Sequence, residues 1–259
     1  MLSDITIGIK TFLRDDMLQH ALFGIRRSMP EVKIIVADDG RVTEEKLNFY
    51  SDMHNTGNFE VHDLPWDSGF GKKSNFIADR LKTKYLLVGS DDFEFGTKEV
   101  RDDVITIVKI LDENPYLDIV SGRVNNNPYE FWLDEEPDGV ITEVRATEFS
   151  KLGLIPCDLT VNYSLIRQKV FENVRWDDEA KIGQGEHASF FLDVKWAGFA
   201  VAYAYGVNIN EQKTRPMEEY RQYRNRARSP ERSCFVKRGI KKYILGDGTV
   251  DYDETISRS

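Results

Sequence analysis

Two adjacent carboxylates, Asp91 and Asp92, follow the apolar run YLLVGS at the point where a buried strand is predicted to end. Two ionised groups this close repel each other, so they must be hydrated, paired with cations or bound to a metal ion. A second pair, Asp38-Asp39, follows the run KIIVA in the same way. Carboxylate oxygens are hard ligands that suit Mg²⁺ or Mn²⁺. The alternative for both pairs is a polar turn, because Asp-Gly is a common turn pair.

Predicted strands and helices alternate along the first half of the chain. Strands are expected at 5–9, 33–37, 59–64 and 85–88, and helices are expected from 15, from 43 to 50, at 72–82 and at 98–113. Their connections are too long for hairpins, which predicts a mostly parallel α/β sheet covered by helices on both sides. In such sheets ligands bind beyond the carboxyl ends of the strands. Both aspartate pairs fall there, which favours a functional role over the turn interpretation.

The second half continues with further predicted strands at 117–121, 140–147, 159–163 and 199–205, and with a helix from about 187. Residues 125–139 are polar and are interpreted as a surface insertion or a hairpin. Neither an internal repeat nor a linker is evident, so one domain is predicted over residues 1–259.

Composition excludes several classes of protein. Hydrophobic residues at 41% and charged residues at 31% are typical of a globular protein. Apolar runs fall short of the roughly 20 residues of a membrane span, and the start of the chain reads as a strand, so cytoplasmic residence is expected. The two cysteines form no CxxC and the four histidines form no HExxH, which argues against the common zinc sites. The stretch GFGKKSN fails the Walker spacing, which excludes a P-loop NTPase.

Positive charge is concentrated in a basic extension, defined here as residues 213–242. This stretch has 11 Lys or Arg against three Glu, a balance of +8 in a chain of net charge −9. A basic segment on an acidic body indicates a local anion site rather than a general nucleic-acid binder.

The chain resembles the inverting glycosyltransferases of the GT-A type, in the broad family 2 group. The likeness covers most of residues 5–228 and rests on five stretches in order: ITIGIKTFLRDD, VADDG, GFGKKSNFIADRLKTKYLLVGSDDFEF, CDLTVNY and WDDEAKIGQGEHASFF. It is most similar to the N-acetylgalactosaminyltransferase-like branch, where an aspartate-rich motif precedes Phe-x-Phe. The resemblance implies the GT-A fold and a hexosyltransferase-like enzyme that moves a sugar from a nucleotide-sugar donor, with a UDP-sugar favoured, to an acceptor hydroxyl.

The resemblance also implies a cation site and a nucleotide site. Asp92 would bind Mn²⁺ or Mg²⁺ directly, while Ser90 stands where the family motif has another aspartate. Many relatives carry a metal-binding histidine after the strand that here reads VAYAYGVNIN, and this sequence has Asn210 there, whose amide oxygen is the expected ligand. The residues expected to contact the nucleotide are Thr11, Asp38, Asp39, Lys72, Lys73, Asn75 and Asp91.

Inversion requires a base that takes the proton of the acceptor hydroxyl. The family places this carboxylate in a Gly-Glu or Glu-Asp element before a helix, so the resemblance makes Glu186 the candidate base; the alternative is a helix-capping glutamate. His187 is expected to contact the donor phosphate or to lie on the surface. The residues expected near the acceptor are Asp158, Trp176 and Asp177.

A helix that starts at Pro216 is predicted in the basic extension. Tyr220 and Tyr223 share one stripe of this helix, and the arginines 221, 224 and 228 share another. Arg221, Arg224 and Arg228 are expected to close over the donor diphosphate, because a guanidinium matches phosphate oxygens. The alternative is a solvated amphipathic helix that packs through its tyrosines.

Three kinds of acceptor fit this resemblance: a glycan, a lipid-linked glycan reached from the periphery of a membrane, and the hydroxymethylated base of a phage-type DNA. The pI of 5.1 argues against DNA. A non-catalytic module that binds nucleotide sugars or carbohydrates is the alternative from a different class, and Ser90 and Asn210 are the residues that keep it open.

Overall fold

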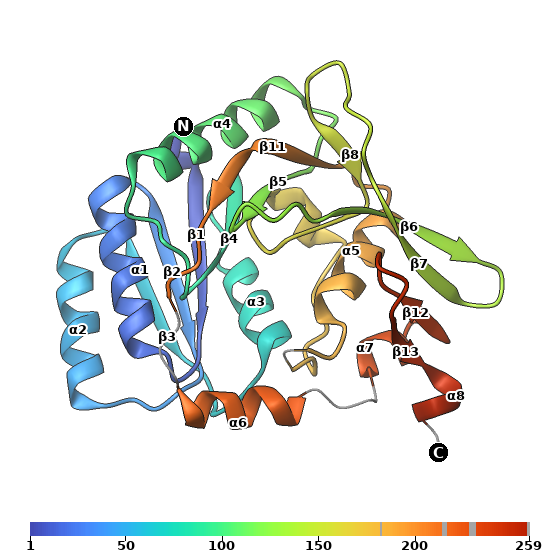
Figure 1. Cartoon of the computed structure of the whole chain (residues 1–259). Coiled ribbons are helices and arrows are strands. Elements are labelled where there is room, and N and C mark those ends of the chain that lie inside the picture. The colour runs from blue at the N-terminus through green and yellow to red at the C-terminus, as the bar shows by residue number, and fades with distance from the viewer. Residues whose placement is uncertain (182, 214–216, 228–231, 258–259) are drawn as a thin grey trace.

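A sheet of eight strands forms the centre of the structure, a computed structural model (Figure 1). Residues 1–181, 183–213, 217–227 and 232–257 are described, without the side chains of 224–227 and 256–257. In spatial order the strands are β3 (Phe59–Asp63), β2 (Lys33–Asp38), β1 (Ile5–Thr11), β4 (Tyr85–Ser90), β10 (Ser164–Arg167), β5 (Ile119–Val124), β11 (Val201–Ile209) and β8 (Ile155–Cys157).

The direction of the strands agrees with the predicted mostly parallel sheet. Strands β3, β2, β1 and β4 are mutually parallel, and β11 is parallel to β5. Strand β10 is antiparallel to both of its neighbours, and β8 is antiparallel to β11 at the edge. The carboxyl ends of β1, β2 and β4 therefore meet at one edge of the sheet.

Helices cover both faces of this sheet, as predicted. On one face lie α1 (Asp15–Ser28), α2 (Glu44–Asn55) and α4 (Lys98–Glu113), and on the other lie α3 (Phe70–Asp79) and α5 (Glu186–Trp196). Successive side chains of a strand point to opposite faces. Accordingly Ile34 and Val36 of β2 pack with the first group of helices, whereas Ile35 and Ala37 pack with the second.

A smaller sheet of five strands lies beside the large one. Its order is β13 (Val250–Asp253), β12 (Lys242–Ile244), β7 (Val140–Arg145), β6 (Glu130–Glu136) and β9 (Leu159–Thr160). Strands β6 and β7 form an antiparallel hairpin, which confirms the hairpin interpretation of the polar segment 125–139. The remaining short elements are α6 (Glu218–Ala227), α7 (Ser233–Val236), α8 (Glu254–Ser257) and two 3₁₀ turns, η1 (Leu2–Asp4) and η2 (Gln168–Glu172).

Several predicted strands have different bounds in the structure; the one expected at 199–205, for example, runs from Val201 to Ile209. The strand expected at 117–121 runs from Ile119 to Val124, and the one expected at 159–163 divides into β9 and β10, which belong to different sheets. The helix expected from Pro216 has described residues from Glu218 onward, and Pro216 itself lies outside the described residues. Among the helices that the structure describes, none is long and apolar enough to cross a membrane.

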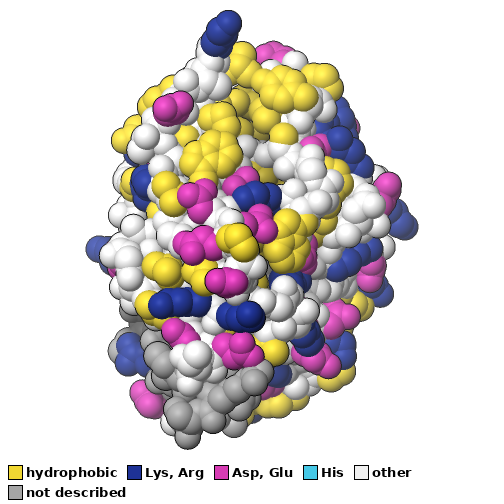
Figure 2. Space-filling view, turned by 90° about the vertical axis from the view of Figure 1, so that its right-hand side faces the viewer, with side chains coloured by type: hydrophobic (Ala, Val, Ile, Leu, Met, Phe, Trp, Pro, Cys, Tyr) yellow, Lys and Arg dark blue, Asp and Glu magenta, His cyan; other side chains and the backbone are white. Residues whose placement is uncertain are grey.

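The basic extension is attached to the acidic body by ion pairs. The Lys237 ammonium lies 2.9 Å from Asp177 and 2.7 Å from Glu179, and Arg238 binds the carboxylate of Asp193. Basic and acidic side chains are interspersed on the face in Figure 2, with a group of hydrophobic side chains in its upper part. Part of the positive charge of the extension thus neutralises carboxylates of the same chain.

Candidate active site

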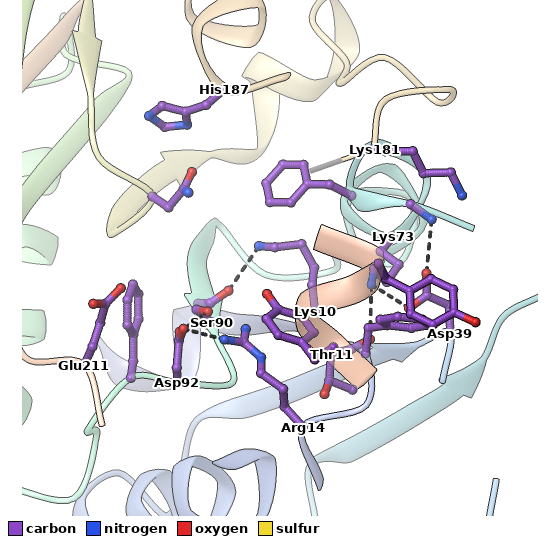
Figure 3. A pocket seen from close by; sticks show the side chains of 18 of the residues that line it. Lys10, Thr11, Arg14, Asp39, Lys73, Ser90, Asp92, Lys181, His187 and Glu211 are labelled. Carbon is purple, nitrogen blue, oxygen red and sulfur yellow. Dashed lines mark hydrogen bonds and ion pairs between the residues drawn. The ribbon is translucent and has the colours of Figure 1, made fainter. Parts of the chain in front are cut away.

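A cavity of about 390 Å³ lies at the carboxyl ends of β1 and β4 (Figure 3). Its volume is within the range of small-molecule sites. The lining comes from the loops after β1 and β4, the start of α3, the segment after β11, the start of α5 and helix α6. Of the residues predicted from the sequence, the cavity brings together Thr11, Asp39, Lys73, Asp92 and His187.

The aspartate pair after β2 divides between the interior and the cavity. Asp38 is buried and lies outside the lining: it accepts hydrogen bonds from Tyr50 Oη at 2.6 Å and from Lys46 Nζ at 2.6 Å. Asp39 lines the cavity and accepts from Lys73 Nζ at 2.5 Å and from the backbone N–H of Gly69 at 3.0 Å. Asp38 therefore joins β2 to α2, whereas Asp39, although it is also buried, borders the cavity.

Of the two aspartates after β4, only Asp92 lines the cavity. Asp91 is fully buried, lies outside the lining, and accepts from the Thr11 hydroxyl at 2.8 Å. Asp92 lines the cavity and accepts from the Ser90 hydroxyl. The Arg14 guanidinium bridges both carboxylates, with Nη1 at 2.6 Å from Asp92 and with Nε and Nη2 on Asp91. Burial alone would lower the pKa of Arg14, but the two carboxylates hold it above its ordinary value.

Two lysines add positive charge inside the cavity. Lys10 of β1 donates to the carbonyl of Gly89 at 3.0 Å. Burial, followed by the nearby Lys73, lowers the pKa of Lys10 from 10.5 to about 8. Lys73 donates to Asp39 and to the backbone carbonyl of Thr11 at 3.1 Å. Lys10 and Arg14 were not predicted from the sequence, since a lysine in a strand and an arginine before a helix form no motif of their own.

One end of the cavity is aromatic. The ring of Phe12 lies 5.1 Å from the rings of both Trp66 and Tyr223. Tyr220, on the same face of α6, lies over the Arg14 guanidinium at 4.7 Å. The predicted tyrosine stripe of α6 therefore faces the cavity, while the Arg221 side chain is exposed and outside the lining.

Glu211, rather than the predicted Asn210, reaches the cavity from the segment after β11. The side chain of Asn210 is exposed and accepts from the Asn208 amide at 3.2 Å. This segment runs beside the Asp92 loop, because the Gln212 N–H donates to the Asp92 carbonyl at 2.6 Å. Glu211 and Asp92 consequently line the same part of the cavity.

Of the predicted base Glu186 and the adjacent His187, only His187 lines the cavity. The Glu186 carboxylate is buried outside the lining and accepts the N–H groups of Gly183 at 3.1 Å and Gln184 at 2.9 Å. Both N–H groups belong to the loop before α5, whose N-cap residue is Gly185, so the carboxylate stabilises this loop and does not cap the helix. His187 lines the cavity and its Nε2 contacts the Thr160 carbonyl. Burial lowers the pKa of His187 to about 4, so its imidazole is neutral at neutral pH.

The remaining predicted residues lie away from the cavity lining. Asn75 donates to the Trp176 carbonyl at 2.8 Å and to Asp178, and the Trp176 ring stacks on Phe190 with centroids 4.1 Å apart. A Cβ on Gly71 would lie 1.7 Å from the Asp177 carbonyl oxygen, so the start of α3 is pressed against this loop. The others outside the lining are Lys72, Asp158 and Asp177; the side chain of Arg224 and all of Arg228 lie outside the described residues.

A divalent cation fits this cavity only together with a ligand. Within the described ranges, no three His, Cys, Asp or Glu side chains are grouped to hold a metal ion. Asp92 and Glu211 offer carboxylate oxygens to one region, and the phosphate oxygens of a nucleotide would supply the further oxygens that Mn²⁺ or Mg²⁺ requires. The side chains present therefore fit a cation that enters with a nucleoside diphosphate.

Comparison with known proteins identifies relatives of the chain, although no family model matches it. It is 31% identical over 221 residues to mouse beta-1,4 N-acetylgalactosaminyltransferase 2, and 30% identical over 202 residues to mouse beta-1,4 N-acetylgalactosaminyltransferase 1. These matches cover 83% and 73% of this chain but only 40% and 35% of the relatives. The chain thus spans less than half the length of the curated relatives it matches.

Solved structures extend the likeness of the fold. GalNAc-T7, crystallised with UDP, GalNAc and Mn²⁺, matches with a TM-score of 0.63 at 13% identity, over 81% of this chain and 44% of that one. The mannosyltransferase PcManGT of Pyrobaculum calidifontis, in complex with GDP-Man and Mn²⁺, matches with a TM-score of 0.61 at 11% identity, over 92% and 64%. The chain has the GT-A fold, and in sequence it is homologous to the beta-1,4 N-acetylgalactosaminyltransferases over part of their length.

Proposed function

We propose that the chain is an inverting glycosyltransferase that moves an N-acetylhexosamine, N-acetylgalactosamine in the first place, from a UDP-linked donor to a hydroxyl of an acceptor glycan. The observation that carries the proposal is one cavity that joins an aromatic end to a region with Asp92, Glu211 and two cationic side chains. The names of the relatives support the sugar and a β-linked product. Because the sugar of a UDP-N-acetylhexosamine donor is α-linked, a β-linked product requires inversion.

The aromatic end is the proposed nucleoside site. Phe12 and Tyr223 line the cavity and would contact a uracil, with Trp66 packed against both rings, and such contacts contribute beyond simple burial. The Asp39 carboxylate accepts from Ser68, Gly69 and Lys73 and retains one further lone pair, which we assign to a ribose hydroxyl.

The part of the cavity lined by Asp92 and Glu211 is the proposed site of the diphosphate. Asp92 and Glu211 would hold Mn²⁺, with Mg²⁺ as the alternative, together with phosphate oxygens of the donor. When bound, the cation stabilises the charge of the leaving diphosphate. Lys10 and Arg14 line the cavity and stabilise the same charge through the chain's own groups.

Two adjacent residues are candidates for the base. Glu186 was predicted from its place in the sequence, but its carboxylate is engaged by two backbone N–H groups. A specific observation favours the adjacent His187, which lines the cavity and is neutral above pH 4. With Nε2–H donating to Thr160, the lone pair on Nδ1 can accept a proton from an acceptor hydroxyl.

Thermal unfolding with nucleoside diphosphates tests the donor site. UDP with Mn²⁺ at about 100 times its Kd should add about 2.7 kcal/mol of stability, which is roughly 5 to 10 °C in Tm for a chain of this size. The Asp92→Asn variant should lose the Mn²⁺-dependent part, whereas Asp134→Asn, an exposed residue of β6, should keep it. GDP, CDP and ADP are the comparison, and equal or absent shifts for all four would refute a UDP-specific site.

Turnover separates an enzyme from a binding module. Incubation with UDP-N-acetylgalactosamine and a glycan array should yield a β-linked product, identified by the coupling of its anomeric proton in NMR. UDP binding without any glycan product or donor hydrolysis would favour the non-catalytic module. Strongly salt-dependent binding to hydroxymethylated duplex DNA would instead favour the DNA-modifying enzyme.

A further inference from the structure

Arg14 holds an unusual position at the edge of the cavity. It follows Leu13, whose φ of +56° lies in the left-handed region that non-glycine residues rarely adopt. Arg14 is also the residue before α1, yet its side chain does not cap that helix. Strained backbone of this kind persists where the surrounding structure determines it, and it is concentrated at functional sites. Here the strained turn directs the Arg14 side chain from β1 across to the end of β4.

The Arg14 guanidinium makes different contacts with the carboxylates of Asp91 and Asp92. Nε, at 3.2 Å, and Nη2 both bind Asp91, while Nη1 alone binds Asp92, at 2.6 Å. Asp91 is fully buried and the Thr11 hydroxyl holds it in place, whereas Asp92 faces the cavity. Of the five N–H donors of a guanidinium, three are used in these bonds and two remain. Asp91 therefore anchors the side chain, and the Nη1 side is the part that can change partners.

We propose that Arg14 is a built-in cation of the donor site: Asp91 fixes its guanidinium, and its Nη1 moves from Asp92 to the diphosphate when Asp92 binds a divalent cation. The inference rests on the proposed function and assigns a role that the sequence motifs did not. Asp91 becomes a positioning residue for Arg14 rather than a nucleotide ligand. Arg14 itself would touch the substrate, since it lines the cavity beside Asp92.

The charges in this region favour such an exchange. A donor diphosphate gains negative charge as the sugar leaves, and a planar guanidinium matches phosphate oxygens in a way that an ammonium does not. Tyr220 of α6 lies over the guanidinium and keeps its plane fixed at the cavity wall.

A purely structural role for Arg14 is the alternative, because a buried carboxylate such as Asp91 needs a partner. The test compares the affinities of UDP and uridine, both with Mn²⁺, by isothermal titration of the full chain. Arg14→Lys keeps a positive charge for Asp91 but loses the fork. It should bind UDP at least about tenfold more weakly, as expected for a charge-assisted bond to phosphate, and bind uridine within about twofold of wild type.

Two further variants make the outcome decisive. Arg175→Lys is the matched control, since this exposed arginine pairs with Asp79 and lies outside the cavity lining. If Arg14→Lys does not fold, the double variant Arg14→Gln with Asp91→Asn removes both buried charges and should show the same selective loss of UDP affinity.

Each other outcome overturns the inference. Equal losses of UDP and uridine affinity would identify a structural role, and unchanged UDP affinity in a folded variant would exclude contact with the diphosphate. If the wild-type protein binds neither uridine nor UDP, whether Mn²⁺ or EDTA is present, the proposed function is wrong as well. The wild-type titration therefore distinguishes failure of the donor site from failure of the Arg14 role.

Discussion

Lys10 is expected to take up a proton when a nucleoside diphosphate enters the cavity. Its pKa is lowered from 10.5 to about 8 by burial first and by Lys73 second, and Asp91 and Asp92 only partly offset this. The ring of His187 adds no opposing charge, because burial keeps it neutral. A diphosphate beside Lys10 favours its charged form and should restore the ordinary pKa.

The number of protons taken up follows from the pKa of Lys10 without ligand, about 8, and its ordinary pKa of 10.5. At pH 9 a lysine with a pKa of about 8 is roughly 10% protonated, and one with its ordinary pKa is roughly 97% protonated. UDP binding at pH 9 should therefore take up about 0.9 protons. At pH 6.5 both states are protonated, so the uptake should be close to zero. Affinity should fall about tenfold per pH unit above pH 8.

The same shift predicts how Lys10 affects stability without a ligand. Between pH 8 and pH 10.5 the unfolded chain binds more protons at this residue than the folded chain does. The contribution of Lys10 to stability therefore rises with pH across that window, and below pH 8 its charge costs the folded state at most about 3 kcal/mol. Lys10→Met should accordingly be more stable than wild type at pH 7.

Calorimetric titration in two buffers of different ionisation enthalpy measures the uptake directly. The slope of the observed enthalpy against the buffer enthalpy gives the number of protons, and Lys10→Met corrects for protons exchanged by the nucleotide itself. Lys72→Met, an exposed lysine outside the cavity lining, is the matched control and should keep the wild-type slope. Equal slopes for wild type and Lys10→Met at pH 9 would refute the reasoning.

Three further predictions concern separate parts of the cavity. Asp92→Asn should abolish the Mn²⁺-dependent increase in UDP affinity without changing uridine affinity, and a retained increase would assign the cation elsewhere. Glu186→Gln should lower the free energy of unfolding by about 1 kcal/mol, because one of two backbone N–H bonds loses its acceptor. Chemical denaturation checks this, and loss of product formation at unchanged stability would instead support Glu186 as the base over His187. Tyr223→Ala should weaken uridine binding about fivefold through loss of ring contact with Phe12, and unchanged uridine affinity by titration would place the nucleoside elsewhere.

The fold was predictable because its signals are local and repeated. Buried runs such as KIIVA and YLLVGS, separated by helices, specify parallel strands whatever their partners are. Partners were harder to predict. Residues 159–163 have the composition of one strand, yet β9 pairs with β6 and β10 pairs with β4 and β5. Composition determines that a segment is extended, whereas the sheet that it joins depends on contacts far along the chain.

The site was predictable where a residue's chemistry and its place at a strand end coincided, as at Asp39 and Asp92. Glu211 was missed for a geometric reason. Strand β11 changes register against β5 between Tyr203 and Asn208. An irregularity of this kind shifts which side chains face a given side by one position. The resemblance placed the ligand at Asn210, whereas after this irregularity the cavity receives the next residue.

Adjacent aspartates at a strand end cannot serve a ligand together, because successive side chains point in opposite directions. At both strand ends only the second member, Asp39 or Asp92, lines the cavity, although Asp39 is itself buried and bound by groups of the chain. The inner member, Asp38 or Asp91, requires a cation or hydroxyl partner, and at β4 that partner is Arg14, which the strained turn at Leu13 brings to the cavity edge. At β4 the chain thus supplies a cation to the inner carboxylate, and the outer carboxylate is the one proposed to bind a cation from solution.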